Sequence, residues 1–290
     1  MSIAILFESQ EWSSFALYED VRRYLPGVQV NLYDLETAVN EEQILESELI
    51  VSRIFASAQF RGHDASLQKV ISILNEAEDR GIPLLNSRAA HFYEINKHLA
   101  AQVLNTYDLP APKVYGCRYP RHGYSDLEVE YPLIIKPNCG GRTTDTHVVW
   151  KAEYLPATWQ LLDPDVEFVI ESYIKPKEDY ITRIEVIGGK CVQLLKKTLT
   201  DSGLAAYHLG SRFTDYSDCP AEVQKLAIDT MNCLDIQMGS LDIIESADGN
   251  YVIDVNSVSN YAEENIEMFH FDLIDATAQF IAQTYQSLRK

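Results

Sequence analysis

The chain has 290 residues, of which 46% are hydrophobic and 23% charged, as expected for a globular protein of two domains or of one domain with an inserted lobe. Its 43 acidic residues outnumber the 24 basic ones, and the net charge of -19 disfavours binding to nucleic acid or to an anionic membrane surface. No apolar run approaches the ~20 residues that a membrane-spanning helix requires. An anionic ligand would therefore need basic residues that gather locally.

The N-terminal segment MSIAILFESQEW has a short apolar run with no basic residues before it, so we expect a first strand and not a signal peptide. The five cysteines are odd in number, widely spaced and free of C-x-x-C pairs. This cysteine usage predicts a reducing, cytoplasmic environment and no zinc site.

The first part of the chain, residues 1–88, is predicted to form an α/β lobe. Residues 3–7 and 49–55 are continuous apolar runs, typical of strands buried on both faces. Residues 64–80 have apolar positions at helical spacing with an aspartate at the start, and residues 81–87 predict a further strand. No G-x-G-x-x-G follows the first strand, which disfavours a dinucleotide fold of that type.

A second, β-rich lobe is predicted over residues 89–178. A helical stretch from 88 to 107 ends at the two prolines of DLPAP. The segment YPLIIKP (131–137) predicts a strand, and CGGRTTDTHVVW (139–150) predicts a loop that returns into another strand. The segment VEFVIESYI (166–174) predicts a strand that runs into a linker.

A third, mixed lobe is predicted over residues 179–290. Its first hairpin (181–197) turns at two consecutive glycines, a favoured two-residue turn. A helix is predicted over 221–236, a second hairpin over 239–256, and a last helix from residue 270 to 288.

The returning strand of the second hairpin, YVIDVN, places Asp254 and Asn256 two residues apart and hence on one face. Oxygen ligands side by side on a rigid strand suit Mg²⁺, with Mn²⁺ an alternative, although an isolated D-x-N is more often the wet face of an ordinary strand. A three-residue loop (248–250) would set Asp242 opposite Asn256, adding a third ligand. This register makes Tyr251, Ile253 and Val255 the apolar row of the strand.

Basic residues at strand ends and helix starts are candidates for an anion site. Lys136 ends an apolar strand beside a loop that contains Gly140, Gly141 and Thr143, where backbone N–H groups and a hydroxyl would contact phosphate oxygens. Lys97 opens a helix. The alternative for Lys136 is a surface lysine whose ammonium reaches water beside a turn.

The glycine-turned hairpin gathers two more cations. A two-residue turn sets Arg183 opposite Leu194 and Ile181 opposite Lys196, so that Arg183 and Lys196 become diagonal neighbours on one face. Two cations there repel each other unless an anion lies between them. The hairpin therefore predicts an anion-binding face.

Three further residues are candidates for contact with a substrate. Arg53 ends a strand of the first lobe and would point into a cleft between lobes. His208 and Arg212 fall in a loop where they would contact an acceptor carboxylate, although a solvated loop explains them equally well. The seven histidines show no metal-ligand spacing.

From residue 84 to the end, the chain resembles the ATP-grasp superfamily, in particular the RimK-type and glutathione-synthetase-like ligases. The resemblance depends on an ordered set of motifs: a lysine before LPAP, a lysine before a glycine loop, VIESYI, LDII and YVIDVN. It implies an α/β ATP-grasp fold with MgATP between the second and third lobes. The implied roles are α- and β-phosphate binding by Lys97 and Lys136, an adenine pocket at Glu171, Tyr173 and Ile174, and ribose contact by Asp179. Arg183 and Lys196 would face the γ-phosphate or acceptor, and Asp242, Asp254 and Asn256 would hold magnesium.

The activity that this resemblance implies is carboxylate–amine (or thiol) ligation through an acyl phosphate, with an amino acid or peptide as substrate. A small-molecule kinase on the same scaffold and a non-catalytic nucleotide-binding module stay open as alternatives. The glycine loop, with bulky Arg142 and Asp145, and Ser240, where many ligases have an arginine, keep the non-catalytic module open. The proline that usually follows the D-x-N element is also absent. The sequence also leaves a homo-oligomer open.

Overall fold

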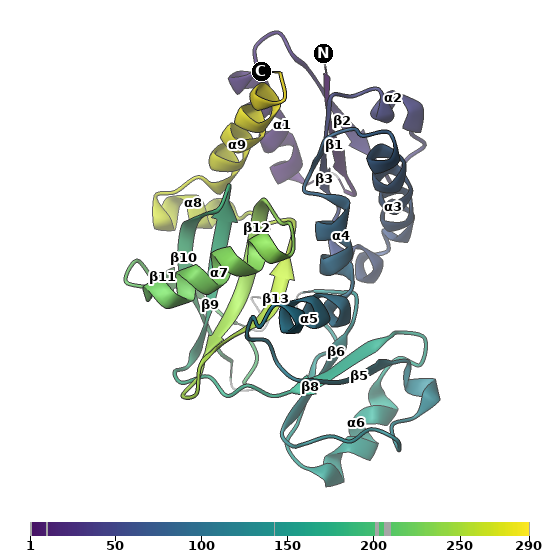
Figure 1. The fold of residues 1–290 in the computed structure, drawn as a ribbon, viewed down its shortest axis with the longest axis vertical. Coiled ribbons are helices and arrows are strands. Elements are labelled where there is room, and N and C mark those ends of the chain that lie inside the picture. The colour runs from purple at the N-terminus through teal and green to yellow at the C-terminus, as the bar shows by residue number, and fades with distance from the viewer. Residues whose placement is uncertain (1, 10, 142, 201–202, 206–209, 290) are drawn as a thin grey trace.

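The computed structural model describes residues 2–289 apart from 10, 142, 201–202 and 206–209. Three separate sheets organise these residues, one within each of the ranges 1–88, 89–178 and 179–290 (Figure 1). The mixed α/β class predicted from the sequence is confirmed. Among the helices of the described residues, none is both long and apolar enough to cross a bilayer.

The N-terminal sheet is parallel, with strand order β2-β1-β3-β4. Its apolar strands are buried on both faces because helices cover both sides, as the continuous runs in the sequence require. The strands are β1 (Ser2–Phe7), β2 (Gln29–Asp34), β3 (Leu49–Arg53) and β4 (Leu84–Leu85). The helical segments are α1 (Trp12–Tyr24), α2 (Glu41–Leu45), η1 (Ala56–Arg61) and α3 (Asp64–Asp79).

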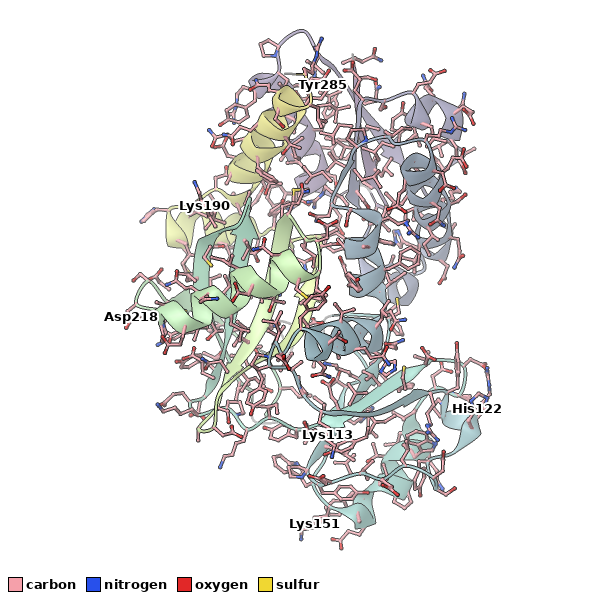
Figure 2. The ribbon with its side chains drawn as sticks, viewed as in Figure 1. Lys113, His122, Lys151, Lys190, Asp218 and Tyr285 are labelled. Carbon is pink, nitrogen blue, oxygen red and sulfur yellow. The ribbon has the colours of Figure 1, made fainter. Side chains whose placement is uncertain are left out.

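The last helix, α9 (Leu273–Ser287), leaves its own range and packs on the N-terminal sheet beside α1 (Figure 1). Its residues Ile274, Ile281 and Tyr285 join Ile3, Ile5 and Leu17 in one hydrophobic core. Tyr285 is 1% exposed, and its hydroxyl donates to Glu48 near the chain ends (Figure 2). The first and third ranges are therefore fastened together through a shared core.

The middle sheet is antiparallel, with strand order β5-β8-β6-β7. One face packs on α6, where Trp159 lies in a small core and donates its indole N–H to the carbonyl of Pro120. This part projects away from the rest of the molecule, as the labelled Lys113, His122 and Lys151 show (Figure 2). Its elements are β5 (Val114–Arg118), η2 (Pro120–His122), β6 (Leu133–Pro137), β7 (His147–Val149), η3 (Ala152–Tyr154), α6 (Leu155–Leu161) and β8 (Phe168–Ser172).

The third sheet is a five-stranded antiparallel sheet of order β11-β10-β9-β12-β13. Helix α7 covers one face with an apolar core, which leaves the other face for polar side chains (Figure 1). The elements are β9 (Tyr180–Ile187), β10 (Lys190–Thr198), β11 (Phe213–Asp215), α7 (Ala221–Cys233), β12 (Met238–Glu245), β13 (Asn250–Asn256) and α8 (Glu263–Phe269).

The helical stretch predicted from 88 to 107 is broken by Asn96 into α4 (Arg88–Ile95) and α5 (Lys97–Thr106). The carboxamide of Asn96 accepts from the backbone N–H of Leu99 and caps α5, so Lys97 opens a helix as predicted. The elements that the sequence patterns did not predict are mostly short or on edges: α1, β2, α2, β5, α6, β11 and α8.

Candidate active site

Two adjoining cavities meet at the third sheet: one lies between the middle and third sheets, and the other lies between the third sheet and helices α8 and α9. The first, which we call the lysine cavity, has a volume of about 120 Å³ and is lined by Lys97, Lys136, the glycine loop and the segment after β8. The second, the arginine cavity, has a volume of about 440 Å³ and is lined by Arg183 and the open face of the third sheet. Thr143, Asp242 and Asp254 line both cavities, so these three residues form their junction.

Backbone hydrogen bonds bring the two lysines together from separate elements. The N–H groups of Lys97 and His98, at the start of α5, donate to the backbone and side-chain oxygens of Asn138 at 3.1 and 2.9 Å. Asn138 follows Lys136 by two residues at the end of β6 and is 5% exposed. The asparagine therefore holds the start of α5 against the end of β6, and the sequence patterns did not identify it.

Each lysine is paired with its own carboxylate. The Lys97 ammonium lies 2.5 Å from Asp254 Oδ1, and the Lys136 ammonium lies 2.5 Å from Glu171 Oε1. Burial acts to raise the pKa of the Asp254 carboxyl, but Lys97 and Lys136 outweigh burial and lower that pKa below its usual value. Burial likewise opposes the charge of Lys97, yet Asp254 raises the pKa of its ammonium. Both members of the Lys97–Asp254 pair are thus held in their charged forms.

The glycine loop between β6 and β7 is fixed against the N-terminal part. A Cβ on Gly140, whose φ is +153°, would approach Phe60 Cε2 to 2.5 Å, so this position needs glycine. Thr143 adopts φ +60° and donates its hydroxyl to the carbonyl of Ala205 at 3.2 Å. The loop therefore bridges the middle sheet, the N-terminal part and the segment after β10.

The outer part of the lysine cavity is apolar. Tyr173 and Ile174 line it from the segment after β8, and Trp150 packs on the Tyr173 ring at a centroid distance of 5.1 Å. The other apolar contributors come from the two neighbouring sheets and the segment after β10 and are Ile134, Ile181, Leu199, Leu204, Ile244 and Ile253. Such a lining suits a flat, weakly polar ring.

Asp242, Asp254 and Asn256 share one face, as predicted, but by a different route. The loop holds four residues, 246–249, and a bulge at Ile253 restores the face, so that Asp242 pairs with Asp254 and Ser240 with Asn256. The predicted pairing of Asp242 with Asn256 was wrong. The predicted apolar row of Tyr251, Ile253 and Val255 was also wrong, because the bulge places Val252 and Val255 in the core. The bulge also frees the carbonyl of Ile253, which accepts from Lys136 Nζ at 2.9 Å.

Asp242, Asp254 and Asn256 are a donor set that fits a hard divalent cation. Their carboxylate and carboxamide oxygens come from adjacent strands, and the Nδ2 atom of Asn256 is buried with no hydrogen-bond partner among the described residues. Within the same described part of the chain, no cluster of three His, Cys, Asp or Glu side chains is arranged to hold a metal. A cation at the junction would therefore need the Asn256 carboxamide as its third protein ligand.

A buried network orients Arg183 in the arginine cavity. Its guanidinium lies 3.1 Å from Asp242 Oδ1 and 3.2 Å from Glu185 Oε1, and Ser259 donates to the other oxygen of Glu185 at 2.5 Å. Burial opposes the positive charge, but Asp242 and Glu185 raise the pKa of Arg183. Burial raises the pKa of the Glu185 carboxyl, and Arg183 counteracts part of that rise. Arg183 is thus a fixed cation beside the junction.

The prediction that Lys196 is the neighbour of Arg183 was wrong by one residue. A bulge at Val192 shifts the hairpin register, so Arg183 pairs with Leu195, and Lys197 shares its face. The Lys197 ammonium lies 3.9 Å from Asp242 Oδ2 and lines the arginine cavity. Lys196 points to the opposite face, where its ammonium lies 4.2 Å from the Tyr216 ring centroid and 4.7 Å from that of Tyr180. The two-residue glycine turn itself is confirmed.

Four other candidates lie outside the two cavities or outside the described residues. Asp179 is exposed and lines neither cavity. Arg53 is 3% exposed and packs behind Tyr261, 4.7 Å from its ring centroid, so that Tyr261 and not Arg53 faces the arginine cavity. Arg212 is exposed and away from both cavities. His208 lies outside the residues that the structure describes.

The sequence patterns missed the residues that close the arginine cavity. Its far wall consists of the segment 260–262, helix α8 and the start of α9, which contribute Asn265, Ile266, Leu273 and Ile274. No motif marks these positions; the Asp272 cap of α9, whose carboxylate accepts from two backbone N–H groups, was the one local signal. The places of Glu185 and Lys197 in the cavity could be predicted only with the correct strand register.

The geometry agrees with a comparison of the chain with protein families. The family model of the RimK-like ATP-grasp domain matches residues 95–283. The chain belongs to this family. Its fold is similar to that of a RimK domain ATP-grasp protein from Sphaerobacter thermophilus, with a TM-score of 0.71 at 16% identity over 97% of this chain and 99% of that one.

Two kinds of curated relative match part of the chain. Human N-acetylaspartylglutamate synthase A is 26% identical over 192 residues, which cover 63% of this chain and 48% of the relative. A D-alanine–D-alanine ligase of Clostridium perfringens is 28% identical over 156 residues, which cover 49% of this chain and 50% of the ligase. The chain thus spans about half the length of the curated relatives that it matches.

Proposed function

We propose that the chain is an ATP-dependent ligase that joins a carboxylate to an amine, or to a thiol, through an acyl phosphate. The observation that supports this most directly is the junction: Asp242, Asp254 and Thr143 line both a small cavity with two lysines and a larger cavity with a fixed arginine. A nucleotide in the first cavity would present its terminal phosphate to a substrate in the second. Membership of the RimK-like ATP-grasp family supports the same assignment.

In this proposal the lysine cavity binds ATP. The adenine ring lies among Tyr173, Ile174 and the apolar residues around them, with polar contacts from the backbone of the β8 linker. Lys97 and Lys136 bind the α- and β-phosphates, and the N–H groups of Gly140 and Gly141 lie over the others. Asp254 and Glu171 hold the two ammonium groups in place through ion pairs.

Asp242, Asp254 and Asn256 would hold Mg²⁺, or Mn²⁺, at the junction. When bound, the cation supplies charge neutralisation to the crowded phosphate oxygens. The chain's own contribution is Arg183 and Lys197, which lie beside Asp242 and face the place where the γ-phosphoryl group would lie. Lys197 takes the role that the sequence assigned to Lys196.

The chemistry follows from this placement. A carboxylate oxygen of the substrate attacks the γ-phosphorus, the bond to the β-phosphate oxygen breaks, and ADP leaves. An amine nitrogen then attacks the acyl carbon, loses a proton, and orthophosphate leaves. Positioning and charge stabilisation suffice for both steps, since no protein nucleophile is required. We propose that the ranges 89–178 and 179–290 act as the two lobes that close on ATP, with 1–88 as the lobe before them.

The ion pairs favour a ligase over a kinase. A kinase with an alcohol acceptor needs a free base near the γ-phosphate. Of the described carboxylates that line the arginine cavity, where the acceptor would lie, Glu185 pairs with Arg183, and Asp242 and Asp254 are the proposed metal ligands, so none is left as a base. A carboxylate substrate needs no such base. The donor set at the junction also argues against a module without catalytic activity.

The substrates are proposed to be amino acids or short peptides. The human relative is named for a product that contains aspartate and glutamate, and the bacterial relative is named for the joining of two alanines. Both names describe an amino-acid amine joined to a carboxylate. The proposal for this chain extends to that class and not to either compound.

A product assay separates the three activities. Purified protein is incubated with ATP, Mg²⁺ and panels of amino acids and dipeptides, and ADP and orthophosphate are both quantified. A ligase releases the two in equal amounts and only when acceptors are present. ADP without orthophosphate identifies a kinase, and no acceptor-dependent ADP release across the panels would contradict the ligase proposal.

A further inference from the structure

The walls of the arginine cavity are divided by polarity. The floor near the junction is the open face of the third sheet, with Arg183, Glu185 and Asp242. The wall that faces this floor comes from α8 and the start of α9, and its apolar side chains are Ile266, Phe271, Leu273 and Ile274. Two more apolar lining residues belong to the sheet itself, where Leu195 pairs with Arg183 and Phe213 pairs with Lys197.

The charges of this cavity leave little for a second anionic group. Among the described lining residues there are two cations, Arg183 and Lys197, against three carboxylates, Glu185, Asp242 and Asp254. Arg183 already contacts two of these carboxylates, and the Lys197 ammonium lies 3.9 Å from Asp242. The remaining polar lining is uncharged: Thr143, Gln193, Asn256, Asn260, Tyr261 and Asn265.

We propose that the arginine cavity selects a substrate with an apolar side chain and discriminates against acidic ones. This inference rests on the proposed ligase function, because it assigns the end of the substrate that reacts to the junction. The reacting group would lie at Asp242 and Asp254, and the side chain would point toward Ile266 and Ile274. The class is therefore an aliphatic or aromatic amino acid, or a peptide that ends in one.

The physical reason is the cost of burying an unpaired charge. A leucine-like side chain placed beside Ile266 and Phe271, which are partly exposed, loses water from apolar surface on both partners, which favours binding. A carboxylate in the same place would lose its hydration without gaining a free cation. A pocket that leaves a polar group unpaired when the wrong ligand binds discriminates far more strongly than a pocket whose ligands differ by one methylene group.

Direct binding tests the selection without depending on turnover. L-leucine, L-phenylalanine, L-aspartate and L-glutamate are titrated by calorimetry into protein that holds Mg²⁺ and a non-hydrolysable ATP analogue. We expect at least one apolar amino acid to bind about tenfold or more tightly than either acidic one. The same panel is repeated with dipeptides that end in leucine or glutamate.

Introducing a positive charge into the apolar lining gives a second test of the selection. Ile266→Arg, on α8, should lower leucine affinity and raise glutamate affinity, which changes their ratio by about tenfold or more. Phe213→Arg, on the opposite wall, is a second variant with the same expected direction. Met268→Arg is the matched control, because Met268 lies on the same helix, is 60% exposed and does not line the cavity. It should leave the ratio unchanged.

The outcomes separate this inference from the ligase proposal. Tighter binding of the acidic amino acids, no binding of any panel member, or an unchanged ratio in both Ile266→Arg and Phe213→Arg would overturn the apolar selection. Selective apolar binding without acceptor-dependent ADP release would support the selection and contradict the ligase activity. Acceptor-dependent ADP release that prefers glutamate would support the ligase activity and contradict the apolar selection.

Discussion

The two cavities differ in how their walls are built. The lysine cavity is lined by residues at strand ends and helix starts: Lys136 ends β6, Lys97 opens α5 and Glu171 lies in β8. The arginine cavity has one wall on a sheet, but its other wall consists of α8, the start of α9 and the segment before them. The charged residues of the first cavity thus lie on regular elements with sequence signals, whereas the second is closed by α8, the start of α9 and the segment before them, which carry few such signals.

The two cavities also use charge differently. In the lysine cavity each cation has its own carboxylate, and a phosphate can replace that carboxylate as the partner of the lysine. In the arginine cavity, Arg183, Glu185 and Asp242 form a shared network that is fixed by Ser259. A network of this kind is costly to rearrange, because Glu185, Asp242 and Ser259 are buried and the Arg183 side chain is only 12% exposed. We therefore expect ligand exchange on the lysine side and rigid positioning on the arginine side.

The largest effect is expected at the junction, which both cavities share. Replacing Asp254 with Asn and Asn256 with Ala removes one charge and one ligand from the face that would hold Mg²⁺. Charge stabilisation of a transition state by such groups is worth ~3 kcal/mol or more, or about a hundredfold in rate. We expect Mg²⁺-dependent ADP release to fall by about a hundredfold or more.

The fold should persist with a lowered melting temperature, because Asp254→Asn leaves the Lys97 ammonium without its carboxylate, while Val252 and Val255, which pack into the core from the opposite face of β13, are untouched. A melting curve and circular dichroism check this. Turnover that stays within about tenfold of the original protein would mean that the junction does not hold the metal. The two cavities would then not share a metal site.

How far the sequence could predict this site depends on what sets each position. Lys97, Lys136 and the D-x-N strand were identified because capping, strand ends and period-two alternation are local rules. The placement of Lys196 and the pairing of Asp242 with Asn256 were wrong, because each hairpin contains a bulge that adds one residue to a strand. A bulge depends on tertiary packing, so the turn residues alone do not reveal it.

The lysine cavity can be broken selectively at Lys136. Replacing Lys136 with Met removes the ammonium but keeps most of the volume. Because the partner Glu171 is 4% exposed, the single change also leaves a buried carboxylate unpaired and should destabilise the fold by about 3 kcal/mol. ATP affinity should fall about thirtyfold, since a charged hydrogen bond to phosphate is worth about 2 kcal/mol.

Adding Glu171→Gln to Lys136→Met separates the two effects. The double variant should recover much of the melting temperature, because no unpaired charge remains buried, yet its ATP affinity by calorimetry should stay low. Recovery of both would show that Lys136 acts on the fold and not on the nucleotide.

The arginine cavity can be tested with two adjacent lysines. Lys197→Ala should lower turnover about tenfold or more, because it removes a cation beside the junction. Lys196→Ala should leave turnover nearly unchanged and cost on the order of 0.5–1 kcal/mol of stability through its lost contacts with Tyr180 and Tyr216. The ratio of ADP release rates between the two variants is the measurement. If Lys196→Ala lost more turnover than Lys197→Ala, the result would support the strand register predicted from the turn alone.

The smallest effect is expected at Asp179, where the resemblance to the family and the geometry disagree. The resemblance assigns this residue to the ribose hydroxyls, yet its side chain is exposed and outside the lysine cavity. An exposed side chain without a ligand contact contributes within about 0.5 kcal/mol, so Asp179→Ala should change ATP affinity by no more than about twofold. Calorimetric titration of the variant with ATP and Mg²⁺ gives the value directly, with the original protein measured in parallel. A tenfold loss would instead mean that the segment after β8 moves over the nucleotide when it binds, since only such a movement brings Asp179 within reach of the ribose. The adenine end of the lysine cavity would then depend on a segment that moves, and the contrast with the arginine cavity would hold for the phosphate end alone.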